Sequence, residues 1–167
     1  MSFLNDEQKA LAQEIASLLT TRGETVSVAE ATAGGLLSAA LLWVPGASRY
    51  YAGGGVVYTL NSRIQLAGVP AATLENYQGT TVDMVATMAE TMRQRLGSTW
   101  CLAESGLAGP TGGRSSAPPG TTRIAVAGPV TRSEVIETGI NDREANMIEF
   151  TTRSLRLLRD VLRQAAG

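Results

Sequence analysis

The stretch Val28-Ala29-Glu30-Ala31-Thr32-Ala33-Gly34-Gly35 connects a β-prone run to a helix-prone run and decides the fold class of this 167-residue chain. Residues 25–29 alternate in polarity like a strand, and residues 36–42 have the composition of a helix. A strand that turns into a helix across a glycine pair leaves backbone N–H groups free at the helix start. We therefore expect a binding site at this junction. Catalytic serines often occupy such turns, but the candidate position here is Ala31, which carries no reactive atom.

Hydrophobic periodicity and turn residues predict an alternation of helices and strands along the chain. Helices are expected at 6–21 (capped by Asn5 or Asp6), 35–43, 61–66, 81–96 and 142–165. Strands are expected at 25–30, 56–59, 100–104, 122–127 and 135–138. This order predicts a three-layer α/β/α sandwich with a mixed sheet, formed as a single domain over residues 1–167. Ligands bind beyond the carboxyl ends of strands in such sheets, which directs attention to 30–35 and 105–120.

The composition excludes several classes of function. A net charge of −1 and a pI near 5.5 give no basic surface for nucleic acid or an anionic membrane. No apolar run is long enough to span a bilayer, and residues 1–7 lack the apolar segment of a signal peptide. The single cysteine, Cys101, excludes an internal disulfide and suits a reducing compartment. We expect a cytoplasmic protein with no membrane or nucleic-acid partner.

Two absences constrain the chemistry further. The chain contains no histidine, which excludes triads that use imidazole as the base and zinc sites that use histidine ligands. Lys9 is the only lysine, and it is expected on the solvated face of the first helix. Cys101 lies in an apolar run and is expected to be a small buried hydrophobe. No metal and no cofactor are expected.

A second candidate constellation is a loop rich in glycine and proline between two predicted strands. Its candidate ligand-binding residues are Ser105, Gly106, Ala108, Gly109, Gly112, Gly113, Gly120 and Thr121. Such a loop can surround a phosphate or carboxylate with backbone N–H groups, although it lacks the lysine of a P-loop. The alternative is an ordinary wide surface loop. Two glycine-rich strand ends in one small protein favour a pocket.

A third candidate lies where the strand at 56–59 leads into the next helix. Tyr58 and Arg63 are placed to face a site at the edge of the sheet. Arg63 can hold a phosphate or carboxylate with two hydrogen bonds, but it stays protonated and cannot act as a base. The alternative is a packed tyrosine and a solvated arginine.

Taken together, these motifs resemble the CinA C-terminal domain family, which includes the bacterial nicotinamide mononucleotide deamidases. The resemblance rests on Ala-Glu-x-x-x-Gly-Gly at 29–35, on Tyr58 with a basic residue five positions later, and on Gly-Leu-Ala-Gly-Pro-x-Gly-Gly at 106–113. Pro-x-Gly-Thr at 118–121 and Asn141-Asp142-Arg143 add to it. The resemblance covers nearly the whole chain and implies an α/β/α fold.

The resemblance also implies which residues form the site. Active members carry a nucleophilic serine at the position of Ala31 and an assisting lysine at the position of Arg63. Thr32 follows the vacant position, and Glu30, Gly34 and Gly35 are implied ligand-binding residues. A pocket of this kind is expected to bind a small molecule, nicotinamide mononucleotide or a related phosphometabolite, without hydrolysing it by the serine–lysine route. The family also makes a homo-oligomer plausible.

Three functions therefore stay open on the sequence. The first is an amidohydrolase that uses another nucleophile. Thr32 is the first choice, with Glu30 or Tyr58 as its base, and Ser105 is the second choice of nucleophile. The second is a non-catalytic binding or sensor protein. The third is an assembly protein with an apolar patch of Trp43, Tyr50 and Tyr51, for which packing in the core is the simpler role.

Overall fold

A five-stranded mixed sheet in the order β2-β1-β3-β4-β5 forms the centre of the structure, a computed structural model that describes residues 1–113 and 115–165. The strands are β1 (Val26–Glu30), β2 (Tyr51–Val56), β3 (Trp100–Leu107), β4 (Thr121–Ala127) and β5 (Arg132–Glu137). β1, β2 and β3 run parallel, whereas β4 and β5 are each antiparallel to their neighbours. The carboxyl ends of the three parallel strands therefore lie at one edge of the sheet.

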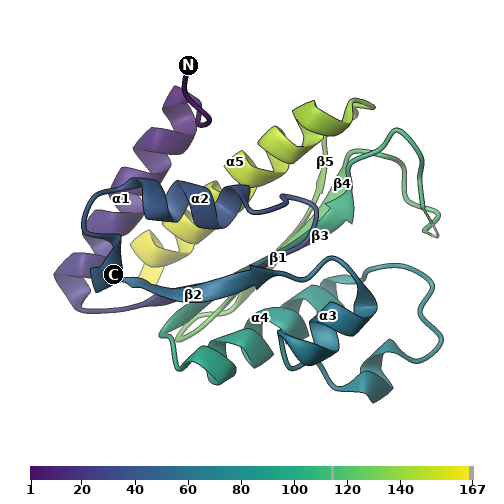
Figure 1. Ribbon diagram of the computed structural model, residues 1–167, viewed down its shortest axis with the longest axis horizontal. Coiled ribbons are helices and arrows are strands. Elements are labelled where there is room, and N and C mark those ends of the chain that lie inside the picture. Colours follow the sequence, from purple (N-terminus) through teal and green to yellow (C-terminus); the bar gives the residue numbers. More distant parts are fainter. Residues whose placement is uncertain (114, 166–167) are drawn as a thin grey trace.

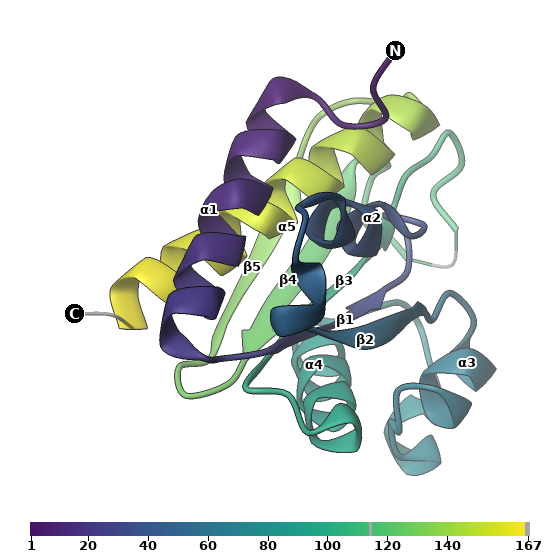
Figure 2. The same cartoon turned by 60° about the vertical axis from the view of Figure 1, so that its left-hand side comes forward.

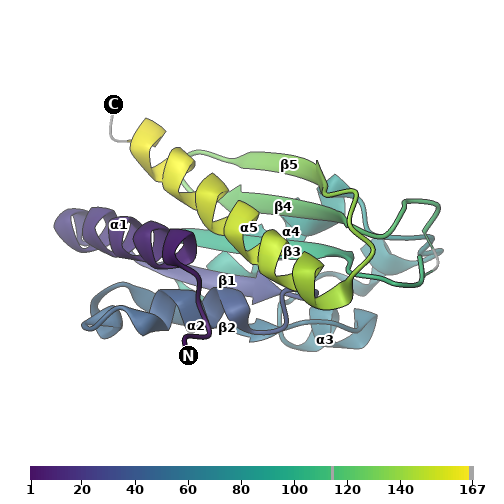
Figure 3. The ribbon, with the colours of Figure 1, turned by 90° about the horizontal axis from the view of Figure 1, so that it is seen from above.

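Helices cover both faces of this sheet (Figures 1 and 3). One face carries α1 (Asp6–Arg22), α2 (Leu36–Trp43) and α5 (Arg143–Ala165). The other face carries α4 (Val82–Leu96), with the short α3 (Leu60–Gln65) beside it (Figure 2). Two 3-10 turns, η1 (Ala47–Arg49) and η2 (Ala71–Leu74), complete the described elements. The predicted three-layer α/β/α sandwich is confirmed. None of the described helices is long and apolar enough to cross a membrane.

The alternation of side chains along the strands separates two hydrophobic cores. In β1, Val26 and Val28 pack with the helices α1, α2 and α5, while Ala29 packs on the α4 side. In β3, Trp100 and Leu102 follow the first pattern. The same period of two assigns Glu30 and Glu104 to the face of α2 and α5, and Ala31 and Ser105 to the face of α4. This division decides which polar residues reach the candidate site.

The first helix begins and ends at the capping residues that its local sequence predicts. Asn5 caps α1 and forms a reciprocal pair of bonds with Gln8, a capping box. Gly23 ends the helix in the left-handed conformation at φ 64°. Lys9 is half-buried, with its ammonium 5.7 Å from the centre of the Trp43 ring, so it is less solvated than expected.

The aromatic residues near Pro45-Gly46 belong to the core rather than to an exposed patch. Tyr50 is 1% exposed, and its hydroxyl donates to the carbonyl of Leu41. Trp43 and Tyr51 are half-buried against the same core. Their packing role, the simpler of the two predicted, is confirmed.

The predicted second strand was misplaced. The structure places β2 at Tyr51–Val56, so the glycines at 53–55 lie inside the strand and residues 57–59 follow it. Glycine weakens a strand, which is why the sequence favoured residues 56–59. β2 is an edge strand, however, and it makes its ladder with β1 alone. The close approach to β1 also requires glycine, because a Cβ on Gly54 would lie 2.3 Å from the carbonyl oxygen of Val28.

β3 is likewise longer than predicted. It continues through Ser105-Gly106-Leu107, which were expected to begin the loop. These residues pair with Arg123, Thr122 and Thr121 of β4, so a partner strand supplies the hydrogen bonds that their own sequence does not predict.

We predict that Gly54→Ala lowers the free energy of unfolding by about 3 kcal/mol, since a backbone atom blocks the new methyl group and the strands must separate. Gly55→Ala is the matched control, because its Cβ would meet only a side-chain carbon at 4.0 Å. The control should change stability by less than about 1 kcal/mol. Urea unfolding of both variants measures the difference, and equal stabilities would contradict this account of β2.

Candidate functional site

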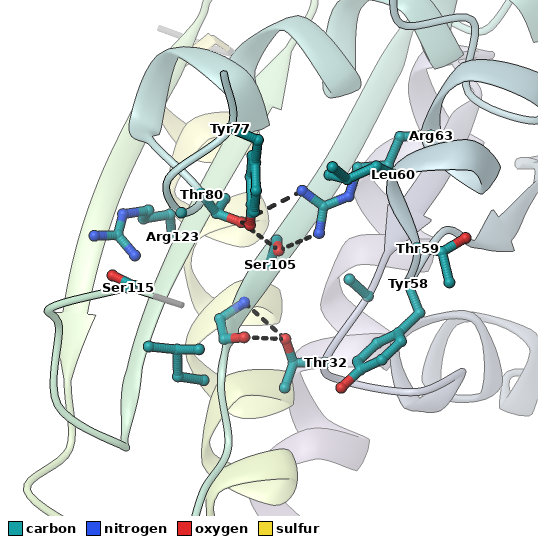
Figure 4. A pocket seen from close by; sticks show the side chains of 14 residues that line it. Thr32, Tyr58, Thr59, Leu60, Arg63, Tyr77, Thr80, Ser105, Ser115 and Arg123 are labelled. Atoms are coloured by element: carbon teal, nitrogen blue, oxygen red, sulfur yellow. Dashed lines mark hydrogen bonds between the residues drawn. The ribbon is translucent and has the colours of Figure 1, made fainter. Parts of the chain in front are cut away.

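A pocket of about 510 Å³ lies beyond the carboxyl ends of β1 and β3, on the side of the sheet that carries α3 and α4 (Figure 4). Three segments supply most of its walls: the β1–α2 junction, the segment from β2 into α3, and the loop before α4. Its lining residues are Ala31, Thr32, Tyr58, Thr59, Leu60, Arg63, Tyr77, Gly79, Thr80, Ser105, Gly106, Leu107, Ser115 and Arg123. Two arginines and several hydroxyl groups line it, and the described lining contains no carboxylate side chain.

Arg63 is the buried cation of this pocket, with only 4% of its surface exposed. Its Nε donates to the carbonyl of Val57 at 3.2 Å, and Nη1 donates to Thr80 Oγ1 at 3.3 Å. Nη2 donates to Ser105 Oγ at 2.8 Å. The guanidinium therefore connects the end of β2, the loop before α4 and β3, which fixes its position. The structure excludes the predicted alternative of a solvated arginine.

The Arg63 guanidinium forms no salt bridge with any carboxylate in the described part of the chain. Burial lowers the pKa of the Arg63 side chain, while Tyr77 and the Glu104 carboxylate act in the opposite direction. Arginine nevertheless stays charged at neutral pH. A buried charge without a counter-ion is costly, so an anion in the pocket would be stabilised beside Arg63.

Tyr58 differs from Arg63 in its surroundings, although both line the pocket. Its side chain is 58% exposed and stands at the pocket wall (Figure 4). The predicted alternative of a packed tyrosine is therefore excluded. Tyr58 therefore lines the pocket with a side chain that is largely open to solvent.

The strand–helix junction lies in the pocket, but its hydroxyl group is already engaged. Thr32 Oγ1 accepts from the Gly106 N–H at 2.7 Å and donates to the Gly106 carbonyl at 2.9 Å. Since its hydrogen is donated to a backbone carbonyl, Thr32 has no contact with a base in the described structure. Ala31 is 3% exposed and presents only its methyl group. These contacts weigh against Thr32 as a replacement nucleophile.

Glu30 lies on the opposite face of the sheet from the pocket and is fully buried. Its Oε1 accepts from the N–H groups of Gly35 at 2.7 Å and Leu37 at 3.1 Å. Its Oε2 accepts from the N–H and the hydroxyl of Ser38 at 2.9 and 2.7 Å. The free N–H groups expected at the start of α2 are therefore bound internally, because the carboxylate satisfies them. Glu30 is also out of reach as a base for Thr32.

Glu104 is a second buried carboxylate that the sequence did not single out. It pairs in register with Glu30 across β1 and β3. Its Oε2 accepts from the N–H groups of Ala33 at 2.9 Å and Ala31 at 3.4 Å, and its Oε1 accepts from Thr122 Oγ1 at 2.9 Å. Burial raises the pKa of Glu104, the hydrogen bonds lower it, and the charge of Glu30 raises it further. The two glutamates together set the conformation of the junction.

The glycine-rich loop contributes less to the pocket than the sequence suggested. Of all the predicted ligand-binding residues, Ser105 and Gly106 line the pocket. Those that do not line it are Glu30, Gly34, Gly35, Ala108, Gly109, Gly112, Gly113, Gly120 and Thr121. Gly112 lines a separate cavity of about 500 Å³ near Ile140. The loop backbone is held by α5 instead, since Asn146 donates to the Ala108 carbonyl and Arg143 to that of Gly109.

Several lining residues escaped the sequence analysis, and Arg123 is the most informative of them. It lies in β4 directly opposite Ser105 of β3, on the α4 face. The alternation of β4 and the pairing of the two strands would have indicated this position. Tyr77 and Thr80, which share a 2.9 Å hydrogen bond, lie in a loop without a periodic signal.

Among the described residues no cluster of three potential metal ligands occurs. Cys101 is fully buried, and burial raises the pKa of its thiol to about 12, as expected of a structural residue.

The sheet order, the helices on both faces and the pocket at the strand ends define an α/β protein with a candidate ligand site at its parallel strand ends. The family model of the CinA C-terminal domain matches residues 8–162, so this chain belongs to the CinA family. A CinA-like protein of Parasynechococcus marenigrum is 47% identical over 120 residues, which are 72% of this chain and 29% of that protein. A CinA-like protein of Shewanella sp. strain ANA-3 is 37% identical over 156 residues, 93% of this chain and 34% of its own length.

Solved structures agree with this assignment. The competence/damage inducible protein CihA from Agrobacterium tumefaciens superposes with a TM-score of 0.90 at 27% identity, covering 98% of this chain and 99% of that one. A competence or damage-inducible protein from Enterobacter asburiae gives 0.87 at 28% identity over 95% and 99% of the two chains. The chain spans about a third of the length of the curated relatives it matches.

We predict that Glu104→Gln gains stability relative to the unchanged protein as the pH rises from 5 to 8. The raised pKa means that the folded state binds the Glu104 proton more tightly than the unfolded chain does. Stability therefore falls as pH increases from the ordinary carboxyl value near 4.3 through the raised one. A glutamine keeps the geometry, since its oxygen accepts from Ala33 and its nitrogen donates to Thr122.

Glu30→Gln is the matched comparison. Both Glu30 oxygens accept from backbone N–H groups, so the NH₂ group of a glutamine would face at least one N–H group. It should lose about 2 kcal/mol or more at both pH values. Urea unfolding at pH 5 and pH 8 separates the two effects. A Glu104→Gln difference that is independent of pH would contradict the assigned role of Glu104.

Proposed function

We propose that this protein binds a phosphorylated, nucleotide-like metabolite, nicotinamide mononucleotide or a relative of it, and does not hydrolyse it by the serine–lysine route of its family. The observation that carries the proposal is the buried Arg63 guanidinium, which has no carboxylate partner among residues 1–113 and 115–165, in a pocket that Arg123 also lines. Guanidinium groups suit phosphate and carboxylate oxygens in charge and in geometry. The pocket volume is within the range of small-molecule sites.

The lining side chains support binding more than catalysis. Ala31 offers no nucleophile, and Arg63 offers no base because an arginine guanidinium stays protonated. The hydroxyl of Thr32 is occupied by Gly106, and the Ser105 hydroxyl accepts from Arg63. Removal of a nucleophile commonly reduces turnover by several orders of magnitude, while binding contacts persist. A non-catalytic binding or sensor role follows from this combination.

Three further expectations stay predictions from the sequence and the family. They are the cytoplasmic location, the homo-oligomeric state and the single domain over residues 1–167. The ligand class proposed above is argued from the pocket lining and not from these three expectations.

We predict that nicotinamide mononucleotide raises the melting temperature of the protein and releases no ammonia. Arg123→Gln should weaken binding about tenfold, because a charge-assisted hydrogen bond is lost at the pocket wall. Arg132→Gln is the matched control, since Arg132 is exposed on β5 and pairs with Glu134 outside the pocket. Thermal shift and calorimetry give the readouts. A folded protein that responds to no phosphorylated nucleotide or phosphate-bearing metabolite would overturn the proposal.

The double variant Ala31→Ser with Arg63→Lys is expected to gain deamidation of nicotinamide mononucleotide. A lysine buried at this position can lose its proton and activate the new serine. Ala31→Ser alone is the control and should stay at least about 100-fold less active, because the remaining arginine cannot accept the proton. Ammonia release measures both. A folded double variant that binds the nucleotide but stays inactive would show that more of the site has changed than these two positions.

A further inference from the structure

The Arg63 end of the pocket lies beside the position that would carry the nucleophile. Ala31 and Ser105 directly follow Glu30 and Glu104, which are paired in register on neighbouring parallel strands. The Ala31 N–H donates to the Glu104 carbonyl at 3.0 Å, which holds the two chain segments together. Arg63 Nη2 donates to Ser105 Oγ (Figure 4), so the guanidinium reaches the strand that lies beside the β1–α2 junction.

The unused donors at this end are few and well defined. A guanidinium has five N–H groups. Val57 takes the one on Nε, Thr80 and the Met84 sulfur take the two on Nη1, and Ser105 takes one on Nη2. These four hydrogen bonds leave the second Nη2 hydrogen unused. Burial lowers the pKa of Arg63, and the nearby Tyr77 hydroxyl group raises it. Ser105 Oγ accepts from Arg63 and so retains its own hydrogen for donation, to Thr80 at 3.3 Å or to a ligand.

Two neighbouring donors and a fixed positive charge match a carboxylate better than a carboxamide. A carboxylate presents two acceptor oxygens, one for Nη2 and one for the Ser105 hydroxyl. A carboxamide presents one oxygen and an NH₂ group, which would point at a donor on a cation. The described lining has no Asp, Glu, Asn or Gln side chain, and the hydroxyl oxygens at this end, Thr80 and Ser105, already accept from Arg63.

We infer that the pocket selects the acid rather than the amide: a phosphorylated nucleotide-like ligand whose carboxylate lies against Arg63 and Ser105 and whose phosphate lies towards Arg123. The inference rests on the proposed function and narrows its ligand class. Under this inference, the arginine at position 63 has a function of its own: it cannot act as a base, but it selects a ligand that carries a carboxylate. The chemical counterpart of nicotinamide mononucleotide with this property is nicotinate mononucleotide.

Calorimetric titration with nicotinate and nicotinamide mononucleotide, a pair that differs only in the acid and amide group, tests the inference. The unchanged protein should bind the acid at least about tenfold more tightly, because charge-assisted hydrogen bonds are roughly twice as strong as neutral ones. Arg63→Gln should reduce this ratio to near one. Arg123→Gln should weaken both ligands by a similar factor and leave the ratio unchanged, which separates a local carboxylate contact from general attraction to a cationic pocket.

Ser105→Ala gives a second variant in case Arg63→Gln does not fold, since Ser105 supplies the other donor. It should reduce the ratio severalfold. Equal affinities for the two nucleotides, or tighter binding of the amide, would overturn the inference while leaving the proposed function standing. A ratio that falls as much in Arg123→Gln as in Arg63→Gln would also overturn it. Binding of neither nucleotide would contradict the proposed function itself and this inference with it.

Discussion

The carboxylate of Glu30 is the constraint on which the candidate site depends. Glu30 is the last residue of β1. Its carboxylate accepts four hydrogen bonds at the start of α2, from the N–H groups of Gly35, Leu37 and Ser38 and from the Ser38 hydroxyl group. An unsatisfied helix terminus in a buried position would be costly, so the bonds hold strand and helix in a single arrangement. The neighbouring Glu104 binds the N–H groups of Ala31 and Ala33. The junction is thereby fixed before any ligand arrives.

This internal solution changes how the protein can recognise an anion. A helix start with free N–H groups is a ready anion site, but here a residue of the chain occupies it. In the proposed function, recognition of an anion is left to side chains on the opposite face, where Arg63 and Arg123 line the pocket. Because three different segments hold Arg63, its guanidinium is already ordered, and the proposed binding would require little further ordering of it.

The contrast between positions 31 and 63 gives the site its chemical character. A serine with a deprotonated lysine can carry out acyl chemistry, whereas an alanine supplies no nucleophile and a charged guanidinium no base. In the proposed function the two positions act in the same direction, since Ala31 supplies no attacking group and Arg63 attracts a negative ligand. The rest of the fold, from the capped first helix to the last, remains that of the CinA family.

Particular elements show why the sequence predicted the fold more completely than the site. Helices α1, α4 and α5 were predicted within one residue at each end, because their apolar periodicity and caps are local properties. β2 was misplaced because its three glycines reflect the approach of β1, a contact absent from the local sequence. Residues 105–107 were assigned to a loop because the bonds that make them a strand come from β4.

The sequence by itself determined the layered α/β/α architecture, the family and the lack of a reactive side chain at Ala31, since all three can be recognised from residue types and spacing. Only the tertiary structure decided which polar residues meet. It assigned Glu30 to the junction rather than to the ligand and brought Arg123 opposite Ser105. It also buried Arg63 without a carboxylate partner in the described chain. The physical reason is that the face of a sheet, the register of its strands and the desolvation of a charge are properties of packed elements, and no single segment contains them.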